Sequence, residues 1–570
     1  MKKQLIGKGT LCVLMLAIAA MVCSCQKEQL AKGTFTATME QYSGQGGKVV
    51  FSNMLFHWMQ NDTIAATRTD GTNYAMGLYF ASEVSQNNTA TLSYFSADGN
   101  TDVTGESFRG DYYAFSPNRI YDSPNSVKLP TTYSTDADGN LIGFPMYAKS
   151  SSTILKFKNL CGMVCLRLHT PSTITYIRKI ALTTNQKVNG TFSVSGGNAP
   201  TLSYTGTPTD QEKSVTLKTL VDISTSHDFF IPLPQGTYSS LTIKLYTADG
   251  KTCTLMLAGE NTLNIVRSQY TVIDLTPTES FSLNFTRATG AKGGFFSVSS
   301  TQKVQFSQGN LQYRAKDENN ALHHWRFAEN QYDHIFTNNW TTSSTTSQIT
   351  GTYYNANSTY WVDLFLWGTS GFRNFQPYYF NYDFNTLMDI AGTNHDWGVY
   401  CSILNGGNSP NLWRTLKKEE WVYLLNTRDG ASEKWAKATI SRTNSNIAGL
   451  ILLPDDWGYP SDITPLICGT DSRFSSNNID LLTWTKLEAL GAIFLPVTGY
   501  LYPSWKINYT TTIGYYWTSS YSHLLDGNIY AFRLSYSDVN IPSASTVNDN
   551  AQIKRGFAVR LVRNAGSDEL

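Results

Sequence analysis

The chain carries little charge of either sign. Only 15% of its 570 residues are charged, and 44 basic against 43 acidic residues leave a formal net charge of +1. A protein that binds nucleic acid usually has a basic patch or a basic overall balance, which this composition does not supply. Nucleic acid is therefore not an expected partner.

Cysteine is sparse and irregularly spaced. Three of the eight cysteines precede residue 26. The other five are an odd number, which is not the pattern of a disulfide framework: Cys161, Cys165, Cys253, Cys401 and Cys468. Four residues along a strand span about 13 Å, so Cys161 and Cys165 cannot form a disulfide and are predicted to be buried. Since no Cys-x-x-Cys motif or histidine cluster is present, no metal or other cofactor is expected.

Hydrophobic runs are short. The apolar stretch near the start, LCVLMLAIAAMV, covers residues 11–22 and follows Lys2 and Lys3. A transmembrane helix needs about 20 apolar residues, so this stretch is too short to be one. A basic start followed by a short apolar core is the pattern of a secretory signal.

The next residues, Val22-Cys23-Ser24-Cys25, resemble a bacterial lipobox. The resemblance implies a signal peptide at residues 1–24 and a lipid on Cys25, and several acyl chains on one residue hold a protein firmly in a membrane. Lipidation of Cys23 fits the flanking residues less well. An ordinary signal peptide with a chance cysteine pair is the other alternative.

The polar segment QKEQ follows Cys25 and includes Glu28. It is similar to tags that send lipoproteins of certain gut and oral Gram-negative anaerobes to the outer face of the outer membrane. The expected location is therefore the extracellular face of the outer membrane, with the protein held by its lipid.

Aromatic residues are abundant: they make up 13% of the chain, including 33 Tyr and 13 Trp. Tyr and Trp suit the recognition of sugars or proteins, but they also fill β-sheet cores, which is the expectation for most of them here. Residues 33–278 alternate in polarity and are rich in turns, for example in TATLSYF, ILKFKNLCGMVCLRLH, LTIKLYT and YTVIDL. This pattern predicts β-sandwiches.

Seven segments in this region occur in an order that resembles the fimbrillin-like family of pilus subunits and anchors. They are FHWMQNDTIA (56–65), GDYYAFSPNRIY (110–121), FPMYAK (144–149), LKFKNLCGMVCLRL (155–168), IRKIALTT (177–184), VNGTFSV (188–194) and FFIPLPQGTYSSLTIKLYTADG (229–250). The resemblance implies two tandem transthyretin-like β-sandwiches, at residues 33–150 and 151–278, with a joint near residues 149–153.

In that family, shaft subunits lose their first strand by cleavage after an arginine, and a neighbour's strand fills the groove by strand addition. No arginine lies between Cys25 and Arg68. Arg68 is expected to follow the first strand, too late for this cut. The departure favours a terminal, anchoring or accessory role over a place in the shaft.

Residues 290–570 are predicted to form a third domain with some helix. One helix is expected to begin with Thr415 as its N-cap. Its apolar stripe consists of Leu416, Trp421, Leu424 and Leu425, with Lys417 and Glu419 outside it. A second helix is expected at residues 481–491, ending at a glycine.

Two parts of this domain, WRTLKKEEWVYLL and GYYWTSS…AFRLSY…RGFAVRLVR, resemble the formylglycine-generating-enzyme-like family. The resemblance spans most of residues 293–570 and implies an α+β, C-type-lectin-like fold. The fold class is therefore mainly β: two β-sandwiches followed by this α+β domain. Oxidising members of the family use two cysteines near the C-terminus, whereas no cysteine follows Cys468 here. No enzyme activity is expected.

Other candidate chemical sites are weak. The lectin calcium motifs are missing, and Asp455-Asp456 alone lacks the spaced oxygen ligands that calcium needs. His395-Asp396 could be read as a dyad, but no serine in a Gly-x-Ser-x-Gly turn accompanies it. No residue is therefore assigned a catalytic role.

These features predict a surface lipoprotein that acts in adhesion. It would be a pilus tip or accessory subunit, joined to other pilus subunits by strand addition, and would present residues 290–570 to a glycan or to a host or bacterial surface protein. The alternative is a stand-alone surface glycan-binding lipoprotein that serves polysaccharide uptake without a pilus. An enzyme with unrecognised residues is a more distant alternative.

Ligand contacts are expected on long irregular loops, where binding residues usually lie. The two longest are residues 392–413 and 500–512, and their candidate aromatic residues are Trp397, Tyr400, Tyr502 and Trp505. Trp505 is the cleanest candidate because polar residues surround it. The alternative for Trp397 is a position in the core, since DWGVY alternates like a strand. Trp413 and Trp421 flank the first helix and are expected in the core.

Overall fold

The computed structural model describes most of the chain after residue 29. The described residues are 30–41, 43–45, 58–69, 74–85, 89–95, 100–104, 110–171, 173–287, 290–334, 346–348, 353–377, 389–443, 446–460, 462–502, 506–508, 513–522, 528–535, 539–540 and 555–566.

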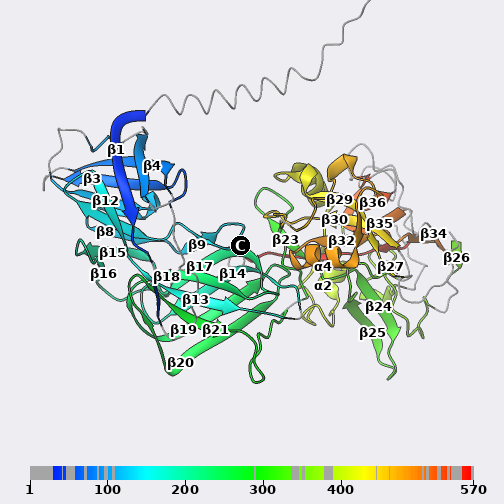
Figure 1. Ribbon diagram of the computed structural model, residues 1–570. Coiled ribbons are helices and arrows are strands. Elements are labelled where there is room, and N and C mark those ends of the chain that lie inside the picture. The colour runs from blue at the N-terminus through cyan, green and yellow to red at the C-terminus, as the bar shows by residue number, and fades with distance from the viewer. Residues whose placement is uncertain are drawn as a thin grey trace, which may run out of the picture. The chain divides into compact units, whose positions relative to one another are not determined.

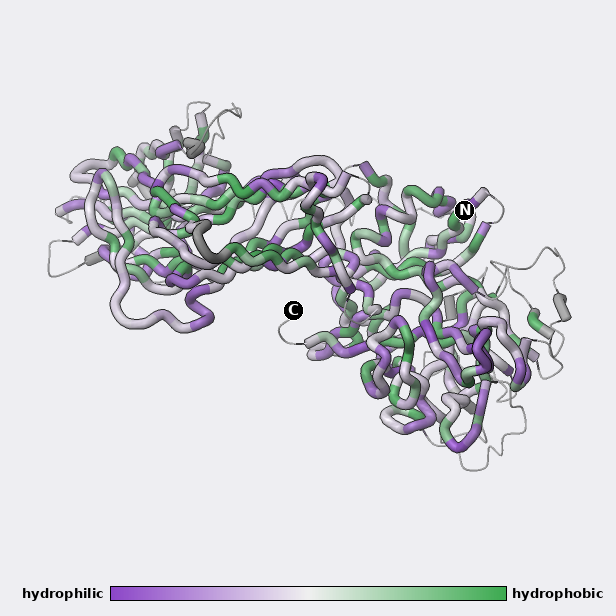
Figure 2. The backbone as a smooth tube through the Cα atoms, turned by 90° about the horizontal axis from the view of Figure 1, so that it is seen from below, coloured by the Kyte–Doolittle hydropathy of each residue, from purple (hydrophilic) through white to green (hydrophobic). Residues whose placement is uncertain are grey.

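The fold is mainly β and divides into two compact units. The first unit contains Met1–Pro171, Ile177–Leu245 and Thr254–Leu283, coloured blue to green in Figure 1. The second unit contains Asn284–Leu570 together with two short segments, Ser172–Tyr176 and Tyr246–Cys253. Hydrophobic and hydrophilic residues alternate over short distances along the backbone in both units, as β-sheets with one buried face require (Figure 2).

A closed seven-stranded sheet contains the first described strand. Its order is β1 (Leu30–Met39), β12 (Ile154–Asn159), β11 (Met146–Ser150), β6 (Tyr112–Ser116), β3 (Thr63–Thr69), β4 (Tyr74–Val84) and β5 (Thr89–Phe95). β1 closes the sheet because it pairs with β12 in parallel and with β5 in antiparallel orientation.

Three further sheets complete the first unit. One has the order β10 (Leu141–Ile142), β9 (Thr132–Thr135), β17 (Ser214–Asp222), β14 (Tyr176–Thr184), β19 (Gly236–Thr247) and β20 (Thr252–Ile265). The second contains β18 (His227–Leu233), β13 (Gly162–Leu168), β21 (Gln269–Leu275) and β2 (Ser43–Gln45). The third contains β16 (Thr201–Ser203), β15 (Gly190–Ser195), β8 (Ser126–Leu129) and β7 (Tyr121–Ser123). Short 3-10 turns lie at Asn118–Ile120 and Gln211–Lys213.

These sheets do not divide at residue 150, where the sequence placed a domain joint. The expected joint, residues 149–153, lies at the turn of the β11–β12 hairpin inside the closed sheet. Two strands that precede residue 150 also pair with strands that follow it: β8 pairs with β15, and β9 pairs with β17. Strand pairing between distant segments therefore mixes the two expected sandwiches, and the cut at 150 is corrected.

The apolar run 154–169 is two strands rather than one. β12 ends at Asn159 in the closed sheet, and β13 begins at Gly162 in a different sheet. Cys161 and Cys165 are fully buried here, as predicted. Other predicted strands are confirmed: TATLSYF is β5, and YTVIDL lies in β21. Residues 46–57, which include the start of FHWMQNDTIA (56–65), lie outside the described residues.

Arg68 lies inside β3, not after the strand as the sequence suggested. β3 pairs with β4 and β6, and Arg68 is opposite Ala75 and Tyr112. Its guanidinium stacks on the ring of Tyr112 at 4.4 Å. A cut after Arg68 would remove an interior strand of the closed sheet together with β1.

The described part of the second unit contains five small sheets. Their strands are β22 (Phe296–Ser297), β23 (Lys303–Phe306), β39 (Leu561–Asn564) and β28 (Arg414–Thr415); β24 (Leu311–Lys316) and β25 (Leu322–Phe327); β26 (Thr346–Gln348), β34 (Lys506–Asn508) and β33 (Tyr500–Leu501); β27 (Leu364–Phe365), β38 (Phe557–Ala558), β35 (Ile513–Ser522), β36 (Asn528–Ser535) and β37 (Val539–Asn540); and β31 (Asn478–Asp480), β29 (Trp435–Ser441), β30 (Asn446–Leu452) and β32 (Ile493–Pro496). Because β23 pairs with β39, the start and end of this unit meet in one sheet.

Both predicted helices are present. α3 (Lys418–Val422) continues into a π-helical turn (Tyr423–Thr427), and the predicted stripe of Leu416, Trp421, Leu424 and Leu425 is buried. α3 begins after Lys417 rather than Thr415, because residues 414–415 are paired in β28. α4 (Leu481–Ala489) is followed by Gly491 with a φ of 95°, the expected glycine at a helix end.

Aromatic side chains dominate the core of the second unit. Seven tryptophans belong to one buried cluster: Trp325, Trp367, Trp397, Trp413, Trp421, Trp435 and Trp517. Trp421 of α3 stacks on Phe532 of β36 with ring centroids 4.8 Å apart. Other helical segments among the described residues of this unit are α2 (Trp397–Tyr400) and short turns at Phe372–Asn374, Ala431–Glu433 and Gly469–Asp471. Across the described residues, no helix has the length and apolarity needed to cross a membrane.

Candidate functional site

An exposed aromatic cluster surrounds Tyr400 in the second unit. The Tyr400 side chain is 42% exposed and contacts Phe372 edge to face, with ring centroids 5.5 Å apart. Phe372 in turn contacts the ring of His395 at 5.1 Å. Segments 371–376 and 395–400 therefore form one aromatic surface. The sequence indicated Tyr400 but not Phe372, although the aromatic-rich string GFRNF was a usable signal.

Buried polar contacts hold the helical turn that carries Tyr400. Asp396 caps α2 by accepting a hydrogen bond from the Gly398 N–H at 3.0 Å, and it also accepts one from the Thr415 hydroxyl at 2.8 Å. Burial raises the pKa of Asp396 to about 6, against the opposing effect of these hydrogen bonds. A side chain at Gly398 would lie 2.3 Å from the Trp413 backbone, so only glycine fits.

Trp397 lies in the core and is corrected as a ligand-binding candidate. It is fully buried, and its indole N–H donates to the Thr369 carbonyl at 3.1 Å. The segment DWGVY is the helical turn α2, whereas the alternation suggested a strand. The His395-Asp396 pair is not arranged as a catalytic dyad: the Asp396 carboxylate holds backbone and hydroxyl donors, and His395 Nδ1 lies 3.3 Å from the Gly368 carbonyl.

The backbone near Tyr400 is unusual at four positions. Non-glycine residues with positive φ lie in both neighbouring loops: Arg373 (53°), Asn374 (66°), Asn408 (49°) and Asn411 (62°). Such backbone is uncommon outside glycine and persists where surrounding contacts hold it. Asn411 supplies one such contact, since its N–H donates to the Val399 carbonyl of α2 at 2.9 Å. The loops at Tyr400 are thus held in a defined shape.

Tyr502 belongs to a second cluster. Its hydroxyl lies 2.9 Å from that of Tyr500, and the Arg555 guanidinium stacks on both rings at 5.0 and 4.8 Å. Tyr502 is half-buried, so part of its ring reaches the surface. Sequence reasoning missed Arg555, which is about fifty positions away in the chain. Trp505 and Cys25 lie outside the described residues, and both assignments stay predictions.

The contacts of Asp455 are structural and are not those of a calcium ligand. Its carboxylate accepts hydrogen bonds from the Ser297 N–H and hydroxyl, at 3.1 and 2.7 Å, and pairs with Arg428 at 3.2 Å and Lys303 at 3.2 Å. Burial raises the pKa of Asp455, but these donors and charges outweigh burial and lower it overall. Within the described ranges, no group of three or more His, Cys, Asp or Glu residues is placed to hold a metal ion.

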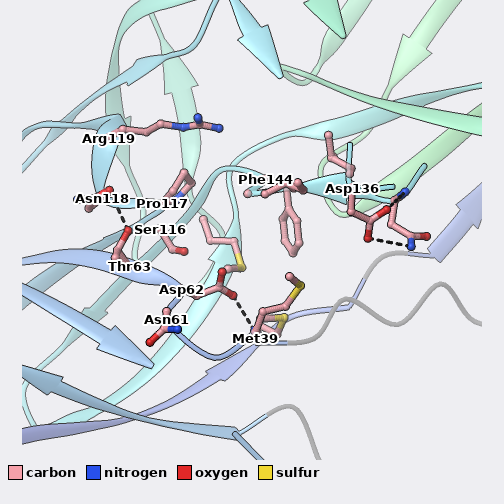
Figure 3. Close-up of a pocket in the computed structure, with 16 residues that line it drawn as sticks. Met39, Asn61, Asp62, Thr63, Ser116, Pro117, Asn118, Arg119, Asp136 and Phe144 are labelled. Carbon is pink, nitrogen blue, oxygen red and sulfur yellow. Dashed lines mark hydrogen bonds between the residues drawn. The ribbon is translucent and has the colours of Figure 1, made fainter. Parts of the chain in front are cut away.

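The first unit contains a cavity of about 590 Å³ (Figure 3). Its wall combines thioether and aromatic side chains, such as Met39, Met146 and Phe144, with polar ones, including Asp62 and Asp136. The Asp62 carboxylate accepts the Met59 N–H at 2.8 Å, and burial raises its pKa. Asp136 is held by the backbone of its own loop. Sequence patterns did not indicate this cavity, because its lining residues come from four separate stretches of chain, at residues 39, 59–63, 116–119 and 136–146.

Comparison with known proteins gives only distant similarity. No protein-family model matches the chain, and no curated protein matches it. Among solved structures, a candidate cell adhesion protein from Bacteroides fragilis is 11% identical over 44% of this chain and 95% of that one, with a TM-score of 0.29. A candidate cell adhesion protein from Bacteroides ovatus is 15% identical over 45% of this chain and 96% of that one, with a TM-score of 0.28. The tip fimbrial protein Mfa3 from Porphyromonas gingivalis is 10% identical over 45% of this chain and 99% of that one, with a TM-score of 0.21. Scores this low carry no conclusion about function.

Proposed function

We propose that this protein is a lipid-anchored surface adhesin whose second unit binds a glycan or a surface protein. The observation that carries the proposal is the exposed Tyr400 ring on a buried, hydrogen-bonded support. A rigid aromatic ring with a polar edge offers contact area at a low cost in conformational entropy. Loops of defined shape over a rigid base are the usual setting for binding residues.

Within a pilus, we propose a tip or accessory position and not a shaft position. Two features of the first unit support this choice. β1 is paired on both edges, and Arg68, the first arginine after Cys25, lies within β3. Cleavage there would remove two strands of the closed sheet rather than one. Other pilus subunits would join by strand addition, in which backbone hydrogen bonds supply the affinity.

Binding, not catalysis, is the proposed activity. Burial raises the pKa of the Cys161, Cys165 and Cys401 thiols, which suppresses the thiolate that a nucleophilic cysteine needs. Asp396 and Asp455, two of the acidic residues that the sequence singled out, both hold structural hydrogen bonds. These contacts support a scaffold that presents surfaces.

The test is adhesion of the full chain carrying Tyr400→Ala to glycans and host cells. Tyr204→Ala is the matched control, because Tyr204 is 39% exposed in the first unit and also meets a phenylalanine edge to face. Loss of an anchoring aromatic typically costs about 2 kcal/mol, so adhesion should weaken roughly thirtyfold in Tyr400→Ala alone. Equal adhesion by both variants would refute the role of this surface.

A further inference from the structure

The outer face of the β24–β25 hairpin, at the margin of the second unit in Figure 1, carries two arginines. Strand residues alternate between faces, so burial of one set assigns the other set to the opposite face. The buried set is Leu311, Tyr313, Ala315, Trp325 and Phe327. Gln312 and Arg314 of β24 therefore share the other face with His324 and Arg326 of β25, and the register places Gln312 opposite Arg326 and Arg314 opposite His324.

Trp361 lies against both arginines. The next residue, Val362, exchanges two backbone hydrogen bonds with Tyr313, at 2.8 and 2.9 Å, which holds this segment beside β24. The Arg314 guanidinium carbon is 4.7 Å from the centroid of the Trp361 ring, and that of Arg326 is 4.2 Å away. Two cations thus share one half-buried indole.

The two arginines differ in their partners. Arg326 Nε donates to Gln312 at 2.9 Å, and its Nη1 pairs at 3.3 Å with the exposed Glu329. Arg314 has no hydrogen bond or ion pair among the described residues, and its Nε is buried. Asp317, which follows β24, lies 3.4 Å from His324 Nε2.

The two guanidinium groups therefore lie close together on one indole, and of the two only Arg326 has a carboxylate partner among the described residues. Burial lowers the pKa of Arg326, and the nearby charge of Arg314 lowers it further. Glu329 and Asp333 raise this pKa, but the net direction is downward. Like charges close together destabilise one another unless an anion lies between them. Planar guanidinium groups bind carboxylates and sulfate-like oxygens through paired hydrogen bonds.

We infer that this face binds an acidic sugar, whose carboxylate or sulfate is held by Arg314 and Arg326. Tyr360 favours a saccharide over an acidic peptide: it directly precedes Trp361 in the chain, is 43% exposed, and contacts Tyr353 with ring centroids 4.6 Å apart. The segment beside the arginines thus also carries an exposed aromatic ring, of the kind on which a pyranose ring stacks. The inference rests on the proposed adhesive function and names the ligand class.

The test is calorimetric titration of the full chain with sialyllactose, sulfated lactose and unmodified lactose. The first two probes distinguish a carboxylate from a sulfate, and the third lacks the anion. Because a hydrogen bond to a charged group is worth roughly a factor of ten or more, Arg314→Gln should weaken binding of the preferred acidic probe about tenfold. Arg314→Lys keeps the charge but removes the paired N–H donors of the guanidinium, so it should weaken binding less than Arg314→Gln does.

Arg473→Gln is the matched control, since it removes the same charge from an exposed arginine bonded to backbone carbonyls. Arg326→Gln provides a second variant if Arg314→Gln fails to fold. Equal acidic-sugar affinity in all three glutamine variants, preference for lactose, or tighter binding of polyglutamate would each overturn the inference. A chain that adheres to cells but binds none of the sugars would overturn it and leave the proposed function standing; a chain that does neither would overturn both.

Discussion

Arg428 is a nearly inaccessible guanidinium, 3% exposed, whose charge is met by Asp455 at 3.2 Å. Its other terminal nitrogen donates to the Lys434 carbonyl at 3.0 Å. Removing one partner of a buried ion pair is costly because the other charge stays desolvated without compensation. Asp455 also joins Ser297 to this pair, so one carboxylate holds three segments of the second unit together.

At the scale of single residues, Asp455→Asn should therefore reduce the free energy of unfolding of the second unit by about 3 kcal/mol. Tryptophan fluorescence during urea unfolding measures this, because every tryptophan except Trp58 lies in that unit. The control is Asp456→Asn, at the exposed residue next to Asp455, and its free energy of unfolding should change by no more than about 0.5 kcal/mol.

The pH dependence of the same variant gives a second measurement. The pKa of Asp455 is lowered in the folded state, so its contribution is present above the ordinary aspartate pKa and is lost as pH falls through the folded value. The stability difference between the unsubstituted chain and Asp455→Asn should stay constant from neutrality to about pH 4, near the ordinary aspartate pKa, and shrink as the solution is acidified further. Equal losses in the two asparagine variants would show that the ion pair contributes nothing specific.

At the scale of elements, β1 closes the seven-stranded sheet of the first unit. Its Phe35 and Ala37 side chains are fully buried, and Glu40, directly after the strand, pairs with Arg267 and accepts the Ser268 hydroxyl at 2.9 Å. Hydrogen bonds from these donors and the charge of Arg267 outweigh burial and lower the pKa of Glu40. The strand is thus held along its edges and at its end.

Deletion of residues 30–39 should open the edges of β5 and β12 and expose the core beneath Phe35. Unpaired strand edges bind extended peptides and promote aggregation. Hydrogen exchange should show lost protection in both strands, and a peptide with the sequence of residues 30–41 should restore it. A peptide with Phe35→Asp is the control. Full protection in the deleted chain without peptide would contradict this role of β1.

At the scale of the whole molecule, the proposed attachment to the membrane depends on Cys25. Several acyl chains on one cysteine would anchor the protein, and a chain without that cysteine would not carry them. Cys25→Ala should therefore abolish labelling by a palmitate analogue and release the protein from membranes, and Cys23→Ala should leave both unchanged. The reverse result would move the lipid to Cys23.

Local patterns were enough to predict several elements. β5, β21 and α4 follow from alternation, turn residues and a terminal glycine within the segments themselves. The buried stripe of α3 was also predictable, since the period of a helix assigns its faces. These features depend on neighbours in the chain, and the sequence alone determined them.

Only the tertiary structure decided which strands pair and which distant side chains meet. The run 154–169 has one continuous apolar pattern, yet β12 and β13 join different sheets because their pairing partners lie far away in the chain. Trp397 and Tyr400 are three positions apart on one short helix, and only packing against Thr369 and Phe372 makes one buried and the other exposed. Asp455 meets Ser297 across 158 positions, and Trp361 meets Arg314 and Arg326 from beside their hairpin. Contacts of this kind leave no local pattern, because their energy comes from groups that only the folded chain brings together.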